Sequence, residues 1–408
     1  MKILLVNNHH FVLGGAERYY LSLGELLKKH GNGVAYFSTH DSRNVPTFWS
    51  KYFIDKVSTQ GRNLKNLLRV LSGIIYSLEA RKNIGGLLDK FKPDIVHLNN
   101  IYFRISPSII FEIKKRKIPI IETVHDYHPI SPNVNLYHDG AVCEITKGGK
   151  YYKAVLHKCV KDSYLISFLV AASFYLHDYW KIYQNKIDLF ISPSRFLRKK
   201  LVDYGLKDSK IIHLPNFTEI GKFHKAQARN KNTYALFFGV LLKHKGLSEL
   251  LGAAGLLPEV TFKIVGDGPE EKNLKRLSQK LRLKNVDFLG RLDDTKLRRV
   301  ISQSLFCIVP SLWYENMPYS ILEAFSLGKP VIAARIGGIP EVVKNGRNGL
   351  LFEAGNNGEL AEKIKLLWTK RKLFGILSNN ALADVKRKYG QEEYYRKVMK
   401  IYKKEVGR

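Results

Sequence analysis

At 408 residues the chain exceeds one typical hydrophobic core, so two domains are expected. Apolar residues make up 45% and charged residues 25% of the sequence, a composition that excludes an intrinsically disordered protein. The 67 lysine and arginine residues exceed the 36 aspartate and glutamate residues. The resulting net charge of +31 points to an anionic partner, which could be a membrane face, a nucleic acid or a polyanionic substrate.

The cationic excess runs through both halves of the chain and is not a basic tail. The aromatic residues form no RNA-recognition, zinc-finger or helix-turn-helix signature, which favours a membrane face over nucleic acid. A lysine-rich proteome would explain much of the charge without any partner. The longest apolar stretch, Tyr164–Tyr175, is shorter than the roughly 18 residues of a membrane span. Three cysteines make no disulfide framework, so a reducing cytoplasm is expected.

The first half of the chain alternates short apolar runs with amphipathic stretches, as in a parallel sheet covered by helices. Asn7 ends the first apolar run too early for a signal peptide, so this run is predicted to be a strand. The strands expected here are Lys2–Val6, Gly33–Phe37, Asp94–Leu98, Ile118–Thr123 and Ile187–Ile191. The helices expected here are Ala16–His30, Asn63–Phe91 and Ser106–Lys115.

The alternation is interrupted where Pro215 and Gly221 precede a polar stretch that ends at Asn232, and we place a hinge at residues 215–232. The strands expected after it are Tyr234–Phe238, Thr261–Val265, Val286–Leu289, Leu305–Val309 and Pro330–Ala334. A basic helix is expected at Glu392–Lys404. The sequence therefore predicts the α/β class, with two doubly wound domains and a cleft between them.

The most informative segment runs from Ser311 to Ala334, where a strand leads into a loop with Glu315 and then a helix with Glu323. In parallel sheets, ligands bind at the carboxyl ends of the strands, where helix N-termini present N–H groups to anions. Asn316 suits this helix start as a polar cap and Pro318 as a first-turn proline. Two carboxylates around an anion-binding helix start predict a site for a phosphorylated ligand rich in hydroxyls, such as a nucleotide sugar.

With further motifs, this segment resembles family 4 of the retaining glycosyltransferases, which have the GT-B fold. The shared motifs are Gly14–Glu17, Val124–Tyr127, Lys245–Gly246, Val265–Pro269, Glu315 with Glu323, Gly337–Glu341 and Asn348–Gly349. The resemblance implies two Rossmann-like domains facing a central cleft, an acceptor-side domain over residues 1–216 and a donor-binding domain over residues 217–384. It also implies that a C-terminal helix at about residues 385–408 crosses back to the first domain.

The resemblance further implies which residues act on a nucleotide-diphosphate sugar. Glu315 and His125 are the expected catalytic residues: Glu315 would hold the sugar hydroxyls, and His125 would face the sugar from the first domain. Glu323 would bind the ribose diol. The other residues implied in donor binding are Gly15, Lys245, Asp267, Arg291, Asn316, Met317, Pro318 and Tyr319. The expected chemistry is front-face attack, in which the departing diphosphate oxygen takes the acceptor proton.

One departure from the family pattern concerns charge. The family's arginine after Gly239 is replaced by Val240, so either Lys243 or His244 supplies the missing charge or the diphosphate is held less tightly. The chain also has no Asp-x-Asp motif, the usual carboxylate clamp for a divalent metal. This favours side-chain cations and the helix dipole at the diphosphate.

A second departure concerns zinc. Related sequences often place four cysteines in the segment from Ser131 to Cys159, but this chain keeps Cys143 and Cys159 and has Ser131 and Thr146 at the other two positions. Two thiols are too few for a structural zinc site unless histidines such as His138 or His157 join them. We expect neither a metal nor another cofactor.

The acceptor is expected to be recognised by the first domain. Arg62–Arg81 carries leucines and isoleucines at helical spacing with cations between them, and Tyr164–Tyr175 is a second apolar block. Both could dock on an anionic membrane that holds a lipid-linked saccharide, and both could equally pack in a core.

The sequence thus predicts a metal-independent hexosyltransferase of surface polysaccharide assembly, cytoplasmic or peripheral on the inner face of the membrane. Its donor would be UDP- or GDP-linked, and its acceptor a saccharide or lipid-linked saccharide. The alternatives are a nucleotide-sugar epimerase on the same fold and a basic nucleic-acid-binding protein. A starch- or sucrose-type synthase is disfavoured because the chain is short and very basic.

Overall fold

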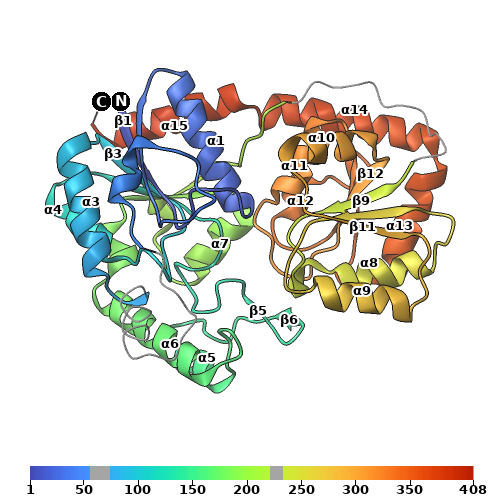
Figure 1. Ribbon diagram of the computed structural model, residues 1–408, viewed down its shortest axis with the longest axis horizontal. Helices are drawn as coiled ribbons and strands as arrows, with labels where there is room; N and C mark the ends of the chain where they lie inside the picture. Colours follow the sequence, from blue (N-terminus) through green and yellow to red (C-terminus); the bar gives the residue numbers. More distant parts are fainter. Residues whose placement is uncertain (56–73, 221–232, 408) are drawn as a thin grey trace. The chain divides into compact units, whose positions relative to one another are not determined.

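The computed structural model describes residues 1–55, 74–220 and 233–407. The chain divides into two compact units (Figure 1). The first comprises Met1–Leu136, Cys143–Leu214 and Tyr395–Arg408, and the second comprises Tyr137–Val142 and Pro215–Tyr394. Each unit contains a parallel six-stranded sheet with helices packed around it. The predicted fold class, α/β with two doubly wound units, is confirmed.

The sheet of the first unit has the strand order β2-β1-β3-β4-β7-β8. Its strands are β1 (Lys2–Val6), β2 (Gly33–Phe37), β3 (Ile95–Leu98), β4 (Ile120–Thr123), β7 (Leu189–Ser192) and β8 (Ile211–His213). The helices are α1 (Gly15–Lys29), α3 (Leu78–Phe91), α4 (Ser108–Lys115), α5 (Tyr152–Leu156), α6 (Tyr164–Tyr179) and α7 (Arg195–Asp203). The short helical turns are η1 (Phe48–Tyr52), η2 (Ile182–Lys186) and η3 (Asp208–Lys210). Strands β3, β4 and β7 are buried along their whole length, because helices cover both faces of a parallel sheet.

The sheet of the second unit has the strand order β11-β10-β9-β12-β13-β14. Its strands are β9 (Ala235–Phe238), β10 (Phe262–Val265), β11 (Val286–Gly290), β12 (Phe306–Val309), β13 (Val331–Ala334) and β14 (Gly349–Phe352). The helical segments are η4 (Lys243–Lys245), α8 (Leu247–Gly255), α9 (Glu271–Lys280), α10 (Asp294–Gln303), α11 (Tyr319–Ser326), α12 (Ile339–Val342), α13 (Asn357–Thr369) and α14 (Arg371–Lys388). Alternate residues of β9 enter different apolar clusters, since Phe237 lies in one and Leu236 in the other. The two clusters are the cores on the two faces of this sheet.

A two-stranded hairpin also belongs to the second unit, although it comes from the first half of the chain. It consists of β5 (Tyr137–His138) and β6 (Ala141–Val142), paired antiparallel. The ring of Tyr137 lies 5.9 Å from the ring of His244 in the second unit. This hairpin was not predicted from the sequence, because two-residue strands have no periodicity to detect.

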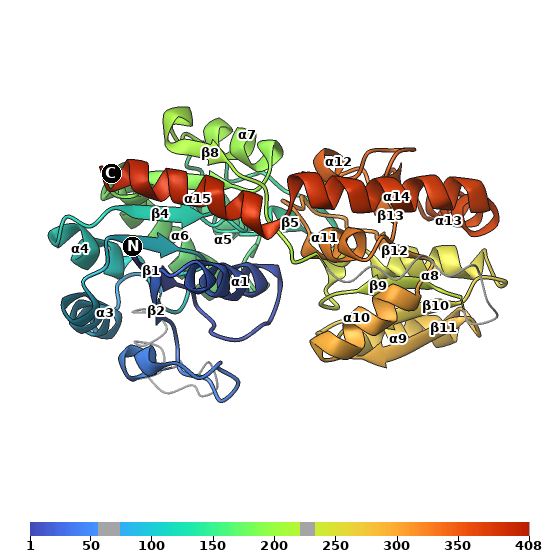
Figure 2. The same ribbon diagram turned by 90° about the horizontal axis from the view of Figure 1, so that it is seen from above.

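The terminal helix α15 (Gln391–Glu405) extends into the first unit. Buried Tyr402 forms a hydrogen bond through its hydroxyl with Nδ1 of His97 on β3. The Tyr395 ring stacks at 3.7 Å on His30, which follows α1. Figure 2 shows α15 lying along the first unit. The region from residue 385 onward is two helices, because Tyr389 and Gly390 separate α14 from α15.

One predicted helix was wrong. The stretch Asn63–Phe91 is not a single helix, because α3 begins at Leu78. The side chain of Ser77 caps α3 by accepting a hydrogen bond from the amide of Ala80 at 3.1 Å. Residues 56–73 of the stretch lie outside the described residues. Strands β8 and β14 were missed, since each is a short apolar run beside a turn.

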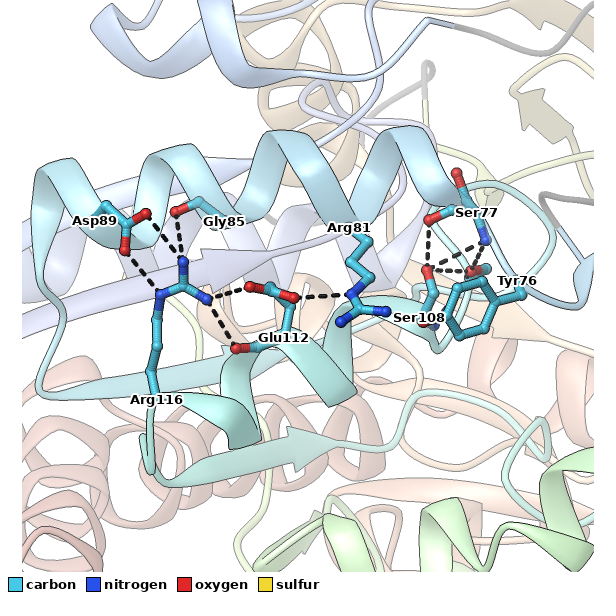
Figure 3. A network of polar contacts seen from close by, with 9 residues as sticks. Tyr76, Ser77, Arg81, Gly85, Asp89, Ser108, Glu112 and Arg116 are labelled. Atoms are coloured by element: carbon cyan, nitrogen blue, oxygen red, sulfur yellow. Dashed lines mark hydrogen bonds and ion pairs between the residues drawn. The ribbon is translucent and has the colours of Figure 1, made fainter.

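A network of ion pairs joins α3 to α4 (Figure 3). The carboxylate of Glu112 lies 2.8 Å from Nε of Arg81, and it also accepts a hydrogen bond from Arg116. The Arg116 guanidinium binds Asp89 with its other edge, at 2.9 and 3.0 Å. Hydrogen bonds from Arg116 and Arg81 hold the pKa of the Glu112 carboxyl below its ordinary value, so the carboxylate stays charged.

Glu112→Gln is expected to reduce the free energy of unfolding by about 1–3 kcal/mol at pH 7, because two guanidinium groups lose a mostly buried partner. Since the folded-state pKa is lowered, this stabilisation is present above the unfolded pKa and is lost as the pH falls through the folded pKa. The difference between variant and wild type should therefore shrink in acid. Urea unfolding at a series of pH values measures this difference in the free energy of unfolding. Glu25→Gln, whose side chain is 73% exposed, is the control and should shift stability by less than about 0.5 kcal/mol. Equal effects of the two substitutions at pH 7 would contradict the prediction.

Candidate active site

Glu315 lies at the centre of a polar cluster in the second unit, in the loop between β12 and α11. Its Oε1 atom is 2.6 Å from Nζ of Lys245 and accepts a hydrogen bond of 2.7 Å from Oγ of Ser311. Burial by itself would raise the pKa of the Glu315 carboxyl, but the Lys245 charge and these hydrogen bonds outweigh it, so the pKa is lowered. A charged carboxylate beside a cation is therefore held at the carboxyl end of the sheet.

The backbone of Glu315 is fixed on both sides. Its amide donates to the carbonyl of Trp313 at 2.8 Å, and its carbonyl accepts from the amide of Gly338 at 2.6 Å. Gly337 has a φ of +60°, and a Cβ atom there would lie 2.3 Å from the Glu315 carbonyl oxygen. Glycine at this position therefore lets the segment after β13 lie directly against the Glu315 loop.

Lys245 ends the helical turn η4, which follows β9. Its ammonium group lies 5.1 Å from the centre of the Trp313 ring, and the His244 ring lies 4.7 Å from the same ring. Burial and then the Lys245 charge lower the pKa of His244 to about 4, so its imidazole is neutral at pH 7. A neutral imidazole does not favour His244 as the cation that replaces the arginine missing at Val240. That Lys243 or His244 supplies this charge stays a prediction.

The start of α11 differs from the sequence-based expectation. Pro318 is the N-cap residue and no side chain caps the helix, so Asn316 is not the polar cap. Asn316 instead lies buried in the loop that carries Glu315. The unsatisfied N–H groups of the first turn belong to the segment that begins at Tyr319. Glu323 is the fifth residue of α11 and is half-buried.

Met317 is held in place by Asn216, a residue that was not predicted from the sequence. The backbone amide of Asn216 lies 3.1 Å from the Met317 sulfur, and the Asn216 side-chain amide donates to the Met317 carbonyl at 3.3 Å. Ser311 and Trp313 were missed as well. Their position directly after β12 was a usable signal, because ligands bind at the carboxyl ends of parallel strands.

Asp267 and Arg291 form a second pair of predicted donor-binding residues. They follow the neighbouring strands β10 and β11, and their charged groups are 3.9 Å apart. Both side chains are about half exposed, so their ion pair contributes little to stability. A ligand can therefore reach either group.

His125 follows β4 in the first unit. Its Nε2 atom is 2.9 Å from Oδ1 of Asn99, and the Asn99 side-chain amide donates to the carbonyl of Val6. Since Asn99 accepts, Nε2 carries the proton and Nδ1 has the lone pair. Burial lowers the pKa of His125 to about 3, so the imidazole is neutral at pH 7. The ring meets Tyr19 edge-on at 4.9 Å.

Gly15 is the first residue of α1 and is exposed. The preceding amide, of Gly14, donates to the carboxylate of Glu17 at 3.0 Å. Gly15 and His125 thus belong to the first unit, whereas the other predicted site residues belong to the second.

Ser131 and Thr146, which stand at two of the four positions considered for zinc, contact each other. Both are buried, and their hydroxyl oxygens are 2.9 Å apart. Cys143 and Cys159 are half-buried, and neither forms a disulfide. Within residues 1–55, 74–220 and 233–407, no three histidine, cysteine, aspartate or glutamate side chains gather in a way that could hold a metal ion.

Comparison with solved structures defines the fold. Sucrose-phosphate synthase from Thermosynechococcus elongatus aligns with a TM-score of 0.75 and 18% identity, over 99% of this chain and 98% of that one. Anabaena HepE in complex with UDP and glucose aligns with a TM-score of 0.69 and 18% identity, over 98% of this chain and 99% of that one. The two parallel sheets therefore form a GT-B fold, as predicted.

The family follows from the sequence. Residues 13–221 match the family described as Glycosyltransferase Family 4, and residues 220–384 match Glycosyl transferases group 1. The chain belongs to the family 4 glycosyltransferases.

Curated relatives share 25–28% of their aligned residues with this chain. An uncharacterized 42.6 kDa protein in the cps region of Klebsiella pneumoniae is 25% identical over 84% of this chain and 87% of its own length. An uncharacterized glycosyltransferase of Methanocaldococcus jannaschii is 28% identical over 55% of this chain, and sulfoquinovosyl transferase of Arabidopsis thaliana is 25% identical over 69%. These last two matches cover only 62% and 56% of the relatives' own lengths.

Proposed function

We propose that the protein transfers a sugar from a UDP- or GDP-linked donor to a saccharide or lipid-linked saccharide acceptor in surface polysaccharide synthesis. The observation that carries the proposal is the cluster of Lys245, Glu315 and Ser311 beside the start of α11. The Klebsiella relative in the cps region and the UDP-bound Anabaena structure support the pathway and the donor class. The reaction would take place on the cytoplasmic side of a membrane.

In the proposed reaction the bond from the sugar C1 to the diphosphate oxygen breaks, and a bond from the acceptor oxygen to C1 forms on the same face. The acceptor proton passes to the departing diphosphate oxygen. Lys245 and the first N–H groups of α11 would meet the charge that develops there, without a metal ion. Glu323 would bind the ribose diol, and Asp267 and Arg291 would lie beside the base.

Glu315 and His125 would position groups and not react covalently. The Glu315 carboxylate stays charged beside Lys245, so it can accept hydrogen bonds from sugar hydroxyls. The His125 imidazole is neutral at pH 7, so it would hydrogen-bond a sugar or acceptor hydroxyl without bringing a positive charge to the site. Isolation of a glycosyl adduct on either side chain would overturn this mechanism.

The proposal predicts that UDP or GDP raises the melting temperature of the protein. A nucleotide at about 100 times its dissociation constant adds about 2.7 kcal/mol to the free energy of unfolding. Glu323→Ala should remove the shift, and the matched control Glu362→Ala, an exposed glutamate on α13, should keep it. Thermal unfolding with each nucleotide measures the effect.

If neither nucleotide stabilises the wild type, or if both variants respond alike, the proposed donor site is wrong. Salt-dependent binding to duplex nucleic acid would then indicate a nucleic-acid-binding protein, in which the net charge of +31 serves to bind phosphates. If a nucleotide sugar is isomerised with no acceptor present, the enzyme is an epimerase.

A further inference from the structure

Helix α6 has apolar residues on its outward side. Its 16 residues include no lysine, arginine or glutamate. The side chains of Tyr164, Phe168, Tyr175 and Tyr179 recur at helical spacing, and they are between 45% and 81% exposed. Leu165 and Leu176, beside this stripe, are also exposed.

The core does not account for this outward stripe. The inward side of α6 contributes Val170, Ala171 and Phe174 to an apolar cluster with Ile74 and Tyr151. Three polar residues of the same helix are buried as well, namely Ser167, Ser173 and His177. Three polar groups thus face inward beside the apolar ones, while a stripe of four aromatic rings faces water, where an ordinary surface helix has polar residues. Core packing, one of the two explanations for the block Tyr164–Tyr175, therefore explains only its inward residues.

Helix α5 extends the apolar area. Its Tyr152 and Leu156 are 51% and 64% exposed, and α5 packs beside α6 at the edge of the first unit (Figure 1). We define the α5–α6 surface as the exposed apolar residues of these two helices: Tyr152, Leu156, Tyr164, Leu165, Phe168, Tyr175, Leu176 and Tyr179. A contiguous apolar surface of this kind marks an interaction site.

Lysines lie next to both helices of the α5–α6 surface in the sequence. Lys153 lies on α5, Lys158 and Lys161 lie between the helices, and Lys181 follows α6. The Lys158 ammonium lies over the Tyr164 ring, 4.7 Å from its centre, so a cation is held next to an exposed aromatic side chain. Tyrosines next to lysines are typical of segments at the boundary between lipid headgroups and acyl chains, where the ring enters and the hydroxyl stays hydrated.

We propose that the α5–α6 surface docks on an anionic lipid membrane. The inference rests on the proposed function in one respect, because docking would bring the first unit to a lipid-linked acceptor.

The net charge favours a membrane over a second copy of the chain as the partner of this surface. At a net charge of +31 two copies repel each other, whereas a layer of anionic headgroups attracts the lysines. No helix within the described residues is long and apolar enough to cross a membrane, so docking would be peripheral. Residues 62–73 of the other predicted docking segment, Arg62–Arg81, lie outside the described residues.

The test is cosedimentation of the full chain with vesicles. Phosphatidylcholine vesicles that contain phosphatidylglycerol should bind the wild type, and pure phosphatidylcholine vesicles should bind it less. Phe168→Ser/Tyr179→Ser should lower binding by about tenfold or more, because the two aromatic rings that would enter the lipid are removed. The matched control is Ile376→Ser on α14 of the second unit, where the side chain is 56% exposed, compared with 57% for Phe168.

Charge variants test the electrostatic part. Lys161→Gln/Lys181→Gln should weaken binding to the anionic vesicles, whereas Lys272→Gln/Lys280→Gln on α9 removes the same charge from another surface and should not. Absence of wild-type binding, or equal binding by the α5–α6 variants and their controls, would overturn the proposal. Loss of a dimer in gel filtration on Phe168→Ser/Tyr179→Ser, without lipid binding, would assign the surface to a second copy.

The same variants separate this inference from the proposed function. Stabilisation by UDP or GDP should be unchanged in Phe168→Ser/Tyr179→Ser, because both residues belong to the first unit and the donor residues of the cluster to the second. Retained nucleotide binding without vesicle binding would reject the docking surface alone. Vesicle binding without nucleotide binding would reject the proposed function alone.

Discussion

Lys245→Ala is expected to lower the rate of sugar transfer by a factor of about 10²–10³, the loss typical when one group that stabilises developing negative charge is removed. Lys245 is the cation found beside Glu315, and Val240 stands where the family has an arginine, so the diphosphate would lose its main cationic partner. The rate is measured as release of UDP or GDP from the donor. Lys272→Ala, an exposed lysine on α9, is the control and should leave the rate unchanged.

The same substitution should also destabilise the fold, because Glu315 is only 5% exposed and would remain as an unpaired charge. Breaking a buried ion pair from one side typically reduces stability by about 3–5 kcal/mol. Without Lys245, burial would raise the pKa of Glu315, so the loss of stability should grow as the pH rises. The double variant Lys245→Ala/Glu315→Gln should recover stability but not activity.

The outcome that would contradict this role of Lys245 is a rate close to that of the wild type in a folded Lys245→Ala protein. Recovery of both stability and activity in the double variant would show that the ion pair serves only the fold.

Gly337→Ala is expected to impair transfer and stability together. The residue has a φ of +60°, and an added Cβ would lie 2.3 Å from the carbonyl oxygen and 2.7 Å from the nitrogen of Glu315. Both atoms are backbone and cannot rotate away, so the Glu315 loop would have to move. A displacement of about 1 Å at a positioned group can reduce the rate by about 10²-fold. The rate of donor turnover and urea unfolding measure the two effects.

Gly346→Ala is the matched control for this prediction. Gly346 has a φ of +73°, but a Cβ there would meet no atom within 4 Å. Its substitution should therefore produce only the backbone strain of a left-handed alanine, about 1–2 kcal/mol, with transfer retained. If the two variants behave alike, contact with the Glu315 loop does not matter and backbone strain explains both.

Much of the fold could be predicted from the sequence because strands buried on both faces are continuous apolar runs. The runs Lys2–Val6 and Gly33–Phe37 are strands at the predicted residues, and the other predicted strands begin or end within one or two residues of the observed ones. Predictions failed where the decisive signal was short. Ser77 starts a helix inside an otherwise helical pattern, and Pro318 takes the N-cap position expected for Asn316.

The sequence by itself determined the class of the protein: two α/β units of the GT-B fold, and family 4 motifs in order along the chain. These properties depend on local periodicity and on residues close together in the sequence. Only the tertiary structure decided which charges meet and which faces are covered. Lys245 contacts Glu315 although the two are 70 residues apart in the sequence, and burial keeps the nearby His244 neutral. Four aromatic side chains of α6 are exposed and do not pack in the core. Contact and desolvation arise when distant segments pack together, so no local pattern contains them.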